Sequence, residues 1–373
     1  VDVELAPLGA ALPGELGPLV VPQRAGVATG DATNHVHVAA PECSHAGVGV
    51  RDRRDLDAVE QRGVVGAVLL ERRQREVVAG FVLREPERPG ADRLLKVAEF
   101  ADAIRADDPV YRDAAVARDR GYDAIPAPPL FPWAAMADRY WPGELTWPGF
   151  DHGFDLSRSL HGEQAYEFER PLVVGDALSG TTTVTDVYRR DGARGGTMTF
   201  AEFETVFRDR ATDALIVTER TSIIELADGP TTGDADETAS SAGADTDAAP
   251  YSLTVPDVSR TDFVKWAGAV GDFARVHFDE PFATAAGYRS VFAQGMLVAG
   301  FASRLVTDWV PASALQSVEI RFSGIVYPGQ TLWFTGESAD GSPATLDVTG
   351  TTGDGVEKLT ATATADPAVA GHD

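Results

Sequence analysis

The chain has 373 residues, a formal net charge of −25 and a sequence pI near 4.6. So acidic a protein is a poor partner for nucleic acid or for an anionic membrane surface, because both need a basic face. The hydrophobic content of 44% is ordinary for a globular protein, and no apolar run approaches the ~20 residues of a membrane helix. The length allows two or three domains.

Cysteine and lysine usage narrows the class further. The single cysteine, Cys43, excludes a disulfide framework, and no signal peptide is visible, so we predict a cytoplasmic protein. The only lysines are Lys96, Lys265 and Lys358, while acidic residues spread through the whole sequence. This composition resembles proteins of salt-loving microbes, in which salt screens the repulsion between like charges, and a merely acidic cytosolic protein is the alternative.

The first segment in chain order, residues 1–90, has poor hydrophobic periodicity. We predict an N-terminal extension of uncertain order, with an extra domain as the alternative, and assign no function to it. Its TGDATNHVH stretch brings Asp31 near His35 and His37 in sequence. The spacing and the residues that follow differ from the motif described below, so we interpret this stretch as a loop.

Two parts of the chain repeat each other. Residues 97–130 align without a gap with residues 263–296, at a constant offset of 166. A weaker match aligns residues 166–180 with residues 320–334, at an offset of 154. Two matches in the same order indicate two copies of one fold. Matched pairs are Phe100 with Trp266, Tyr111 with His277, Gly121 with Gly287, Phe168 with Phe322, and Gly175 with Gly329.

Each copy is predicted to contain a helix, an irregular loop, a second helix and then several strands. Near period-2 runs rich in β-forming residues, such as TMTFAEFETVFRD and TLWFTGES, predict the strands. The longest helix candidate runs from Gly295 to about Trp309 and has one apolar stripe. A long helix packed on an antiparallel sheet is an α+β architecture.

A linker separates the two copies. Residues 226–250 are small, acidic and turn-forming, which predicts a flexible segment. The predicted organisation is therefore an extension over residues 1–90, a first domain over 91–225, this linker, and a second domain over 251–367.

The most specific pattern is GDFARVHFDEPFATAAGYRSVFAQGML, residues 271–297. It resembles the signature of MaoC-like dehydratases, the (R)-specific or type-2 enoyl-CoA hydratases, in which Asp-Phe-Asn-Pro-x-His-x-Asp precedes a Gly-aromatic step and His-Gly-Met-Leu. The words DDPVYRD, GYDAIPAPP and LHGEQAYEFERPLVVGD resemble the degenerate N-terminal dehydratase half that often precedes such a domain. The resemblance covers roughly residues 91–366, and it implies two hot-dog domains that form a pseudo-dimer.

The sequence departs from the family pattern at two places. Ala274 and Arg275 stand where Asn-Pro is usual, which puts the conformation of the loop in question. Gln294 replaces the usual His before Gly-Met-Leu, and we expect this change to matter less, because the useful group beside it is a backbone N–H.

The resemblance implies a set of site residues. Asp272 and His277 would hold one water, which attacks C3 of an enoyl thioester and supplies the proton for C2. Gly295 opens the long helix, and its N–H would meet the thioester oxygen. Asp279 is expected to be a turn or cap residue. The residues expected to line the substrate pocket are Phe273, Tyr288, Gln294 and Met296.

The first copy lacks these groups. Ala106 and Tyr111 stand at the positions of the Asp/His pair, and Pro129, which has no N–H, stands at the position of the helix-opening glycine. We therefore expect the first copy to be inactive and, as the resemblance implies, to complete the pseudo-dimer and widen the acyl pocket.

The predicted activity is the reversible hydration of trans-2-enoyl thioesters of CoA or of a carrier protein to (R)-3-hydroxyacyl thioesters, a reaction of fatty acid metabolism. No cofactor or metal is expected, because histidines and carboxylates do not cluster at ligand spacing and no Gly-rich phosphate loop is present. A homodimer of pseudo-dimers is possible. The alternatives are a hot-dog acyl-CoA thioesterase and a non-catalytic acyl-CoA-binding subunit.

Overall fold

The computed structural model describes residues 77–79, 91–135, 154–155, 157–191, 196–226, 249–339 and 342–370, all within the unit Arg53–Asp373. The loop predicted around Asp31, His35 and His37 lies outside the described residues, as does most of the predicted linker.

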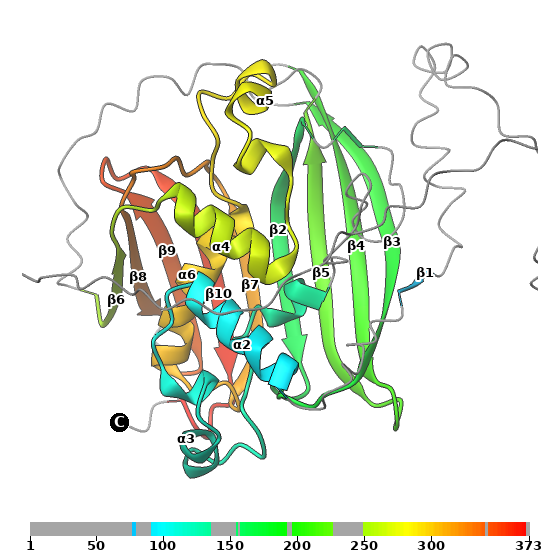
Figure 1. Ribbon diagram of the computed structural model, residues 1–373, viewed down its shortest axis with the longest axis vertical. Helices are drawn as coiled ribbons and strands as arrows, with labels where there is room; N and C mark the ends of the chain where they lie inside the picture. The colour runs from blue at the N-terminus through cyan, green and yellow to red at the C-terminus, as the bar shows by residue number, and fades with distance from the viewer. Residues whose placement is uncertain are drawn as a thin grey trace, which may run out of the picture. The chain divides into compact units, whose positions relative to one another are not determined.

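The described strands form one antiparallel sheet in the order β1-β3-β4-β5-β2-β7-β10-β9-β8-β6. The order has the same pattern from either edge, so two five-stranded halves meet where β2 pairs with β7 (Figure 1). The first half contains β1 (Val77–Ala79), β2 (Ser159–Phe168), β3 (Leu178–Asp191), β4 (Thr197–Asp209) and β5 (Leu215–Glu225). The second contains β6 (Tyr251–Val255), β7 (Leu315–Phe322), β8 (Leu332–Ser338), β9 (Thr345–Thr352) and β10 (Glu357–Ala365).

One strand comes from the segment predicted to be an extension. β1 pairs with β3, with Val77 opposite Thr182, just as β6 pairs with β8 in the second half. The sheet of the first half therefore includes residues that precede position 91.

Helices lie against one face of this curved sheet (Figure 1). The longest described helix, α6, spans Gly295–Trp309, so the prediction of a helix over these residues is confirmed. Its residues from Met296 to Ser303 are all buried. The other helical elements are α2 (Ala91–Ala103), η4 (Pro109–Tyr111), α3 (Ala114–Asp119), η5 (Phe131–Ala135), α4 (Arg260–Val270), η8 (Arg275–His277) and α5 (Glu280–Ala285).

The internal repeat is also present in three dimensions. The N–H of Ala127 donates to the carbonyl of Leu172 at 2.8 Å, and the N–H of Ala293 donates to the carbonyl of Val326 at 2.8 Å. The two donors are related by the offset of 166 and the two acceptors by the offset of 154. The same backbone contact thus recurs in both copies.

A pseudo-twofold axis relates the two halves. Phe100 in α2 and Trp266 in α4 are matched by the repeat, and their ring centroids lie 5.1 Å apart. At the seam of the sheet, Ala165 pairs with Glu319, which is also its own counterpart. Residues that contact their own counterparts lie on the axis between two related copies. The predicted α+β fold, a pseudo-dimer of two hot-dog domains, is confirmed.

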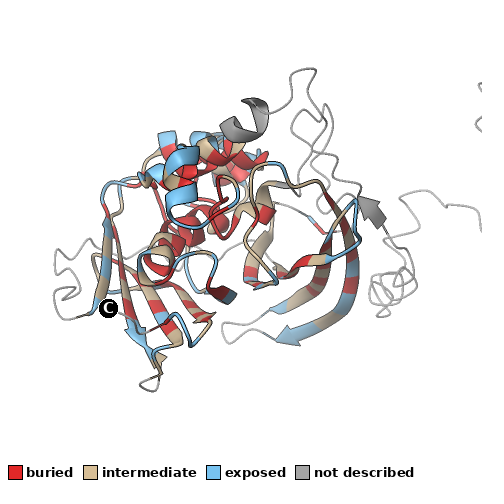
Figure 2. Ribbon diagram, turned by 90° about the horizontal axis from the view of Figure 1, so that it is seen from below, coloured by how far each residue is buried: buried red, intermediate tan, exposed pale blue. Residues whose placement is uncertain are grey.

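Close contacts between helices hold the halves together. Arg105 donates to both carboxylate oxygens of Asp262, at 3.0 and 2.7 Å, and Asp262 also belongs to the capping box that opens α4. Gly300 lets α6 approach the residues after α2, because an added Cβ would lie 2.5 Å from Cγ2 of Ile104. Buried residues gather between the helices and the sheet (Figure 2).

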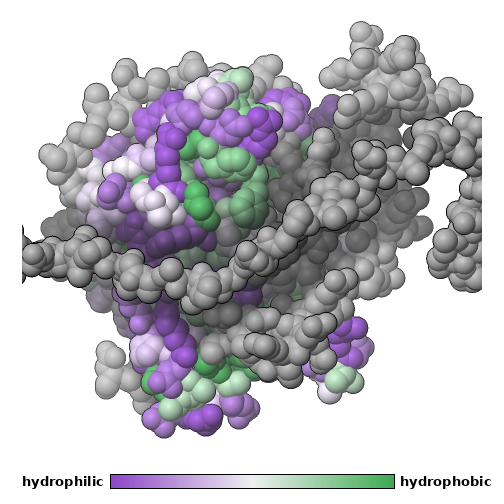
Figure 3. Space-filling view, in the orientation of Figure 1, coloured by the Kyte–Doolittle hydropathy of each residue, from purple (hydrophilic) through white to green (hydrophobic). Residues whose placement is uncertain are grey.

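The surface of the described part mixes hydrophilic and apolar residues on the face drawn in Figure 3. Only four large hydrophobic residues among those described are exposed: Val264, Phe273, Phe278 and Val369. Within the described ranges, no helix has both the length and the apolar character needed to cross a membrane.

Candidate active site

The loop after α4 carries Asp272. Helix α4 ends at Val270 and is capped by Gly271, whose φ of 83° is the left-handed conformation that favours glycine at a helix C-terminus. The carboxylate of Asp272, the next residue, accepts a hydrogen bond from the N–H of Ala274 at 3.3 Å. The chain then forms η8, and the side chain of Asp279 caps α5 by accepting from Phe282, which confirms the expected cap.

The imidazole of His277 has a defined orientation. Its Nδ1 donates to the carbonyl of Phe292 at 2.8 Å, and the ring packs edge-on against the ring of Phe292 at 5.0 Å. In a neutral ring with a proton on Nδ1, the other nitrogen, Nε2, keeps its lone pair and can accept a proton. The contact with Phe292 therefore leaves Nε2 as the ring nitrogen of His277 that carries the lone pair.

Gln294 links the Asp272 loop to the start of α6. Its side-chain nitrogen donates to the carbonyls of Phe263 at 3.3 Å and of Asp272 at 3.5 Å. Its side-chain oxygen is buried and has no hydrogen-bond partner among the described residues. The backbone carbonyl of Asp272 thus contacts Gln294, and the imidazole of His277 contacts Phe292, so both loops touch the segment just before Gly295.

Gly295 is the first residue of α6, where backbone N–H groups lack partners within the helix and the helix dipole is positive. An added Cβ would lie 3.4 Å from the ring of Phe322 and 3.6 Å from Cβ of His161. These are ordinary van der Waals distances, so the packing of the protein itself does not require glycine here.

The four predicted pocket residues differ in how far they are exposed to solvent. Tyr288, Gln294 and Met296 are buried, with 3%, 2% and 1% exposure, whereas Phe273 is 51% exposed and lies on the surface. Burial raises the pKa of Tyr288 to about 12. Its hydroxyl has no hydrogen-bond partner among the described residues. A buried polar atom without a partner calls for an explanation, such as a water or a ligand.

The corresponding place in the first half is apolar and narrow. Burial raises the pKa of Tyr111, the counterpart of His277, to about 12. Pro129 and Leu315 line a cavity of about 10 Å³, which has room for about one water. The lining residues are Ala127, Pro128, Pro129, Phe168, Pro171, Leu172, Ala312 and Leu315. We refer to this place as the vestigial site.

Sequence reasoning missed His161, which β2 of the first half places beside Gly295. The imidazole contacts the rings of Trp133 and Phe322, with ring centroids 5.1 and 4.9 Å away. Burial lowers its pKa to about 4, so the ring is neutral at ordinary pH. Strict alternation along β2 would place His161 on the same face as the exposed Glu163 and Glu167. A register shift between His161 and Glu163 changes this, so no signal in the sequence pointed to His161.

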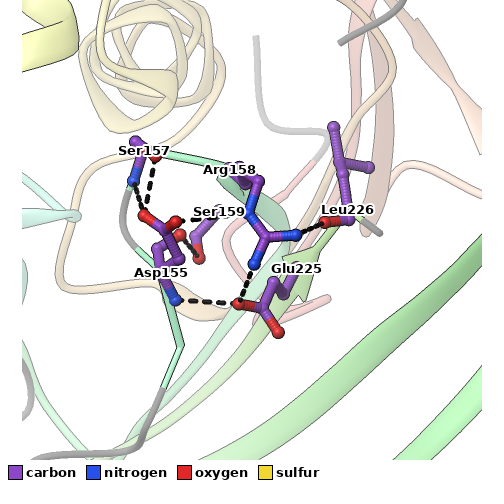
Figure 4. A network of polar contacts seen from close by, with 6 residues as sticks. All are labelled: Asp155, Ser157, Arg158, Ser159, Glu225 and Leu226. Carbon is purple, nitrogen blue, oxygen red and sulfur yellow. Dashed lines mark hydrogen bonds and ion pairs between the residues drawn. The ribbon is translucent and has the colours of Figure 1, made fainter. Parts of the chain in front are cut away.

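A polar network anchors the start of β2, just before His161 (Figure 4). Arg158 donates to the carboxylates of Asp155 at 3.2 Å and Glu225 at 3.3 Å, and to the carbonyl of Leu226 at 2.8 Å. The N–H of Asp155 also donates to Glu225 at 2.8 Å. These hydrogen bonds connect the segment that leads into β2 with the end of β5, close to His161 in the sequence.

The described residues contain no group of three or more His, Cys, Asp or Glu side chains that could hold a metal ion.

Two family models match the chain. Residues 95–218 match the FAS1-like dehydratase domain region, and residues 238–358 match the MaoC-like domain. Together they cover most of the described part of the chain.

The chain is also similar to individual curated proteins. A UPF0336 protein of Thermobifida fusca is 40% identical over 101 residues, which are 25% of this chain and 59% of the relative. A UPF0336 protein of Parafrankia sp. is 34% identical over 111 residues, which are 29% of this chain and 70% of the relative. The chain spans about 60% of the length of the first curated relatives that it matches.

A solved MaoC-like dehydratase superimposes with a TM-score of 0.55 at 25% identity, over 73% of this chain and 94% of that structure. The family models, the solved MaoC-like dehydratase and the ten-stranded double hot-dog sheet agree. The chain therefore belongs to the MaoC-like dehydratase family, with a FAS1-like dehydratase region as its first half.

Proposed function

We propose that the chain is a hydro-lyase that adds water reversibly to a trans-2-enoyl thioester of CoA or of a carrier protein, giving the (R)-3-hydroxyacyl thioester. The observation that carries the proposal is that the backbone of Asp272 and the imidazole of His277 both bind residues just before Gly295, which opens the longest described helix. The vestigial site, where proline and apolar residues stand instead, supports the asymmetry expected of one functional centre.

The proposed reaction uses three groups. Asp272 and His277 hold one water, and Nε2 of His277 is free to accept a proton, because Nδ1 donates to Phe292. The water oxygen bonds to C3 of the enoyl thioester, and a proton from the same water reaches C2. The N–H of Gly295 donates to the thioester oxygen while negative charge develops there.

The unpartnered polar atoms nearby also support a bound ligand. The hydroxyl of Tyr288 and the side-chain oxygen of Gln294 are buried without partners among the described residues. Water or a polar part of the substrate in this region would satisfy them. We propose both residues as part of the pocket wall, with Met296, and give Phe273 a place at its exposed edge.

The experiment is a hydration assay of the full chain with crotonyl-CoA, in which absorbance at the enoyl-thioester band falls as water adds. We expect Asp272→Asn and His277→Ala each to lower kcat/KM by at least about 10²-fold while the protein stays folded, because positioned acid–base groups typically contribute 10²–10⁴-fold. The matched control is Tyr111→Phe at the counterpart of His277, with activity unchanged. Wild-type turnover in both site variants would disprove the proposed pair.

The same assay separates the alternative activities. A thioesterase would release free CoA thiol, which a thiol reagent detects, without first consuming the double bond. A non-catalytic binding subunit would bind crotonyl-CoA and change neither signal. Cytoplasmic location and a homodimer of pseudo-dimers stay predictions, to be checked by fractionation and by sedimentation.

A further inference from the structure

A polar layer crosses the inner face of the first half, buried except at His161, which is half-buried. Its members are His161, Gln164, Tyr166, Glu219 and Thr221, and we call this set the polar layer. Gln164 is its centre, with hydrogen bonds to His161 at 2.9 Å, to Glu219 at 2.7 Å and to Thr221 at 2.9 Å. The hydroxyl of Tyr166 donates to Glu219 at 3.0 Å.

The second half folds the same strands without any of these polar groups. The offset of 154 matches β2 to β7, and the antiparallel register then matches β5 to β10. The counterparts are Leu315 for His161, Val318 for Gln164, Ile320 for Tyr166, Ala361 for Glu219 and Ala363 for Thr221. All of the counterparts are apolar and buried. Strand pairing and core packing therefore do not require polar residues at these positions.

The polar layer also carries a cost. Glu219 is fully buried, and one of its carboxylate oxygens has no hydrogen-bond partner among the described residues. Burying a carboxyl group with incomplete hydrogen bonding disfavours folding relative to an apolar core. An apolar solution is available in the same chain, so stability does not account for the layer.

Its position points to the active site. His161, at one end of the layer, lies beside Gly295, which opens α6. Its counterpart Leu315 lies in the vestigial site with Pro129, the counterpart of Gly295. The polar His161 thus lies beside Gly295, whose N–H the proposed reaction needs, whereas the apolar Leu315 lies beside Pro129, which has no N–H.

We propose that His161 is a substrate-positioning residue of the active site, contributed by the first half, and that the polar layer behind it fixes its ring. This inference rests on the proposed function and names a contact for its substrate, the neutral thioester segment next to the acyl group. The ring is held by contacts with Trp133 and Phe322 and by the hydrogen bond of Nε2 to Gln164.

The chemistry of the ring fits such a contact. His161 is uncharged at ordinary pH because burial lowers its pKa. A neutral imidazole does not compete with the Gly295 N–H for the thioester oxygen as a cation would. It offers polar and aromatic surface to the thioester and to the amide of the pantetheine arm, which CoA and carrier proteins share.

Two substitutions test the contact by activity. His161→Leu introduces the residue of the vestigial site, and His161→Gln keeps a polar group that can reach Gln164. We expect kcat/KM with crotonyl-CoA to fall about 10-fold in His161→Leu, because the ring that positions the thioester segment is lost, and to stay within about threefold of wild type in His161→Gln. The matched control is Leu315→Met, a volume-conserving change at the counterpart, with unchanged kcat/KM. A folded His161→Leu protein with wild-type kcat/KM would overturn the proposal.

A second measurement needs no substitution in the working enzyme. Nitrogen NMR of ¹⁵N-histidine-labelled full chain is recorded with and without butyryl-CoA, whose saturated chain cannot be hydrated. We expect the ring signals of His161, assigned with His161→Gln, to shift together with those of His277. A shift of His277 alone would overturn the contact. Absence of crotonyl-CoA hydration by wild type would instead reject the proposed function, and the butyryl-CoA shifts would still decide the contact.

Discussion

The substitution Gly295→Ala tests whether this glycine is needed for the packing of the protein or for the approach of a ligand to the start of α6. The new methyl group would meet Phe322 at 3.4 Å and His161 at 3.6 Å, both ordinary contacts. Alanine is also the better helix former, by up to about 1 kcal/mol. We therefore expect the free energy of unfolding to stay the same or to rise slightly.

Activity should respond in the opposite direction. The methyl group would stand where the thioester oxygen has to approach the N–H at the start of α6. Removal of one oxyanion donor costs ~10²–10³-fold in kcat in other enzymes, and we expect a loss of this size from Gly295→Ala. The measurements are kcat/KM with crotonyl-CoA and a urea unfolding curve on the same preparation.

Gly268 provides the matched control, because it lies inside helix α4 and nothing lies within 4 Å of an added Cβ. Gly268→Ala should show the same small gain in stability with unchanged kcat/KM. A folded Gly295→Ala protein with wild-type kcat/KM would refute the assignment of this N–H to the thioester oxygen. A loss of stability well above 1 kcal/mol would refute the packing argument.

Three further predictions concern stability. Burial raises the pKa of Glu219 from 4.5 to about 7, so the free energy of unfolding of wild type falls as pH rises through this window. Glu219→Gln lacks this titration, and its stability relative to wild type should rise by up to about 3 kcal/mol between pH 5 and pH 8 in urea unfolding. An equal difference at both pH values would contradict this. Arg105→Ala leaves the buried carboxylate of Asp262 without its bidentate partner, which should cost about 2–3 kcal/mol in the same assay, with no change as the contrary result. Gly300→Ala places a methyl 2.5 Å from Ile104 and should cost about 1–3 kcal/mol, measured as a lower unfolding midpoint, and a tolerated alanine would show that the helices can separate.

The fold and one side of the candidate site could be predicted from the sequence because their signals are local or repeated. The start of α6 at Gly295 follows from an apolar stripe at helical spacing, and the cap at Asp279 follows from the preference of Asp for turns and caps. The matched copies followed from the constant offsets of 166 and 154, which the paired backbone contacts now reproduce. Neighbours along one helix or loop are fixed by its period, so these inferences needed no long-range information.

Only the tertiary structure decided which groups of the first half lie near Gly295. His161 reaches that helix end because β2 pairs with β7 across the seam, a pairing between strands of different domains. The pairing of β1 with β3, and the hydrogen bonds of Gln294 that bring the Asp272 loop to α6, are long-range in the same way. Such contacts depend on how the whole sheet closes around the helices, and no spacing within a single segment of the chain carries that information.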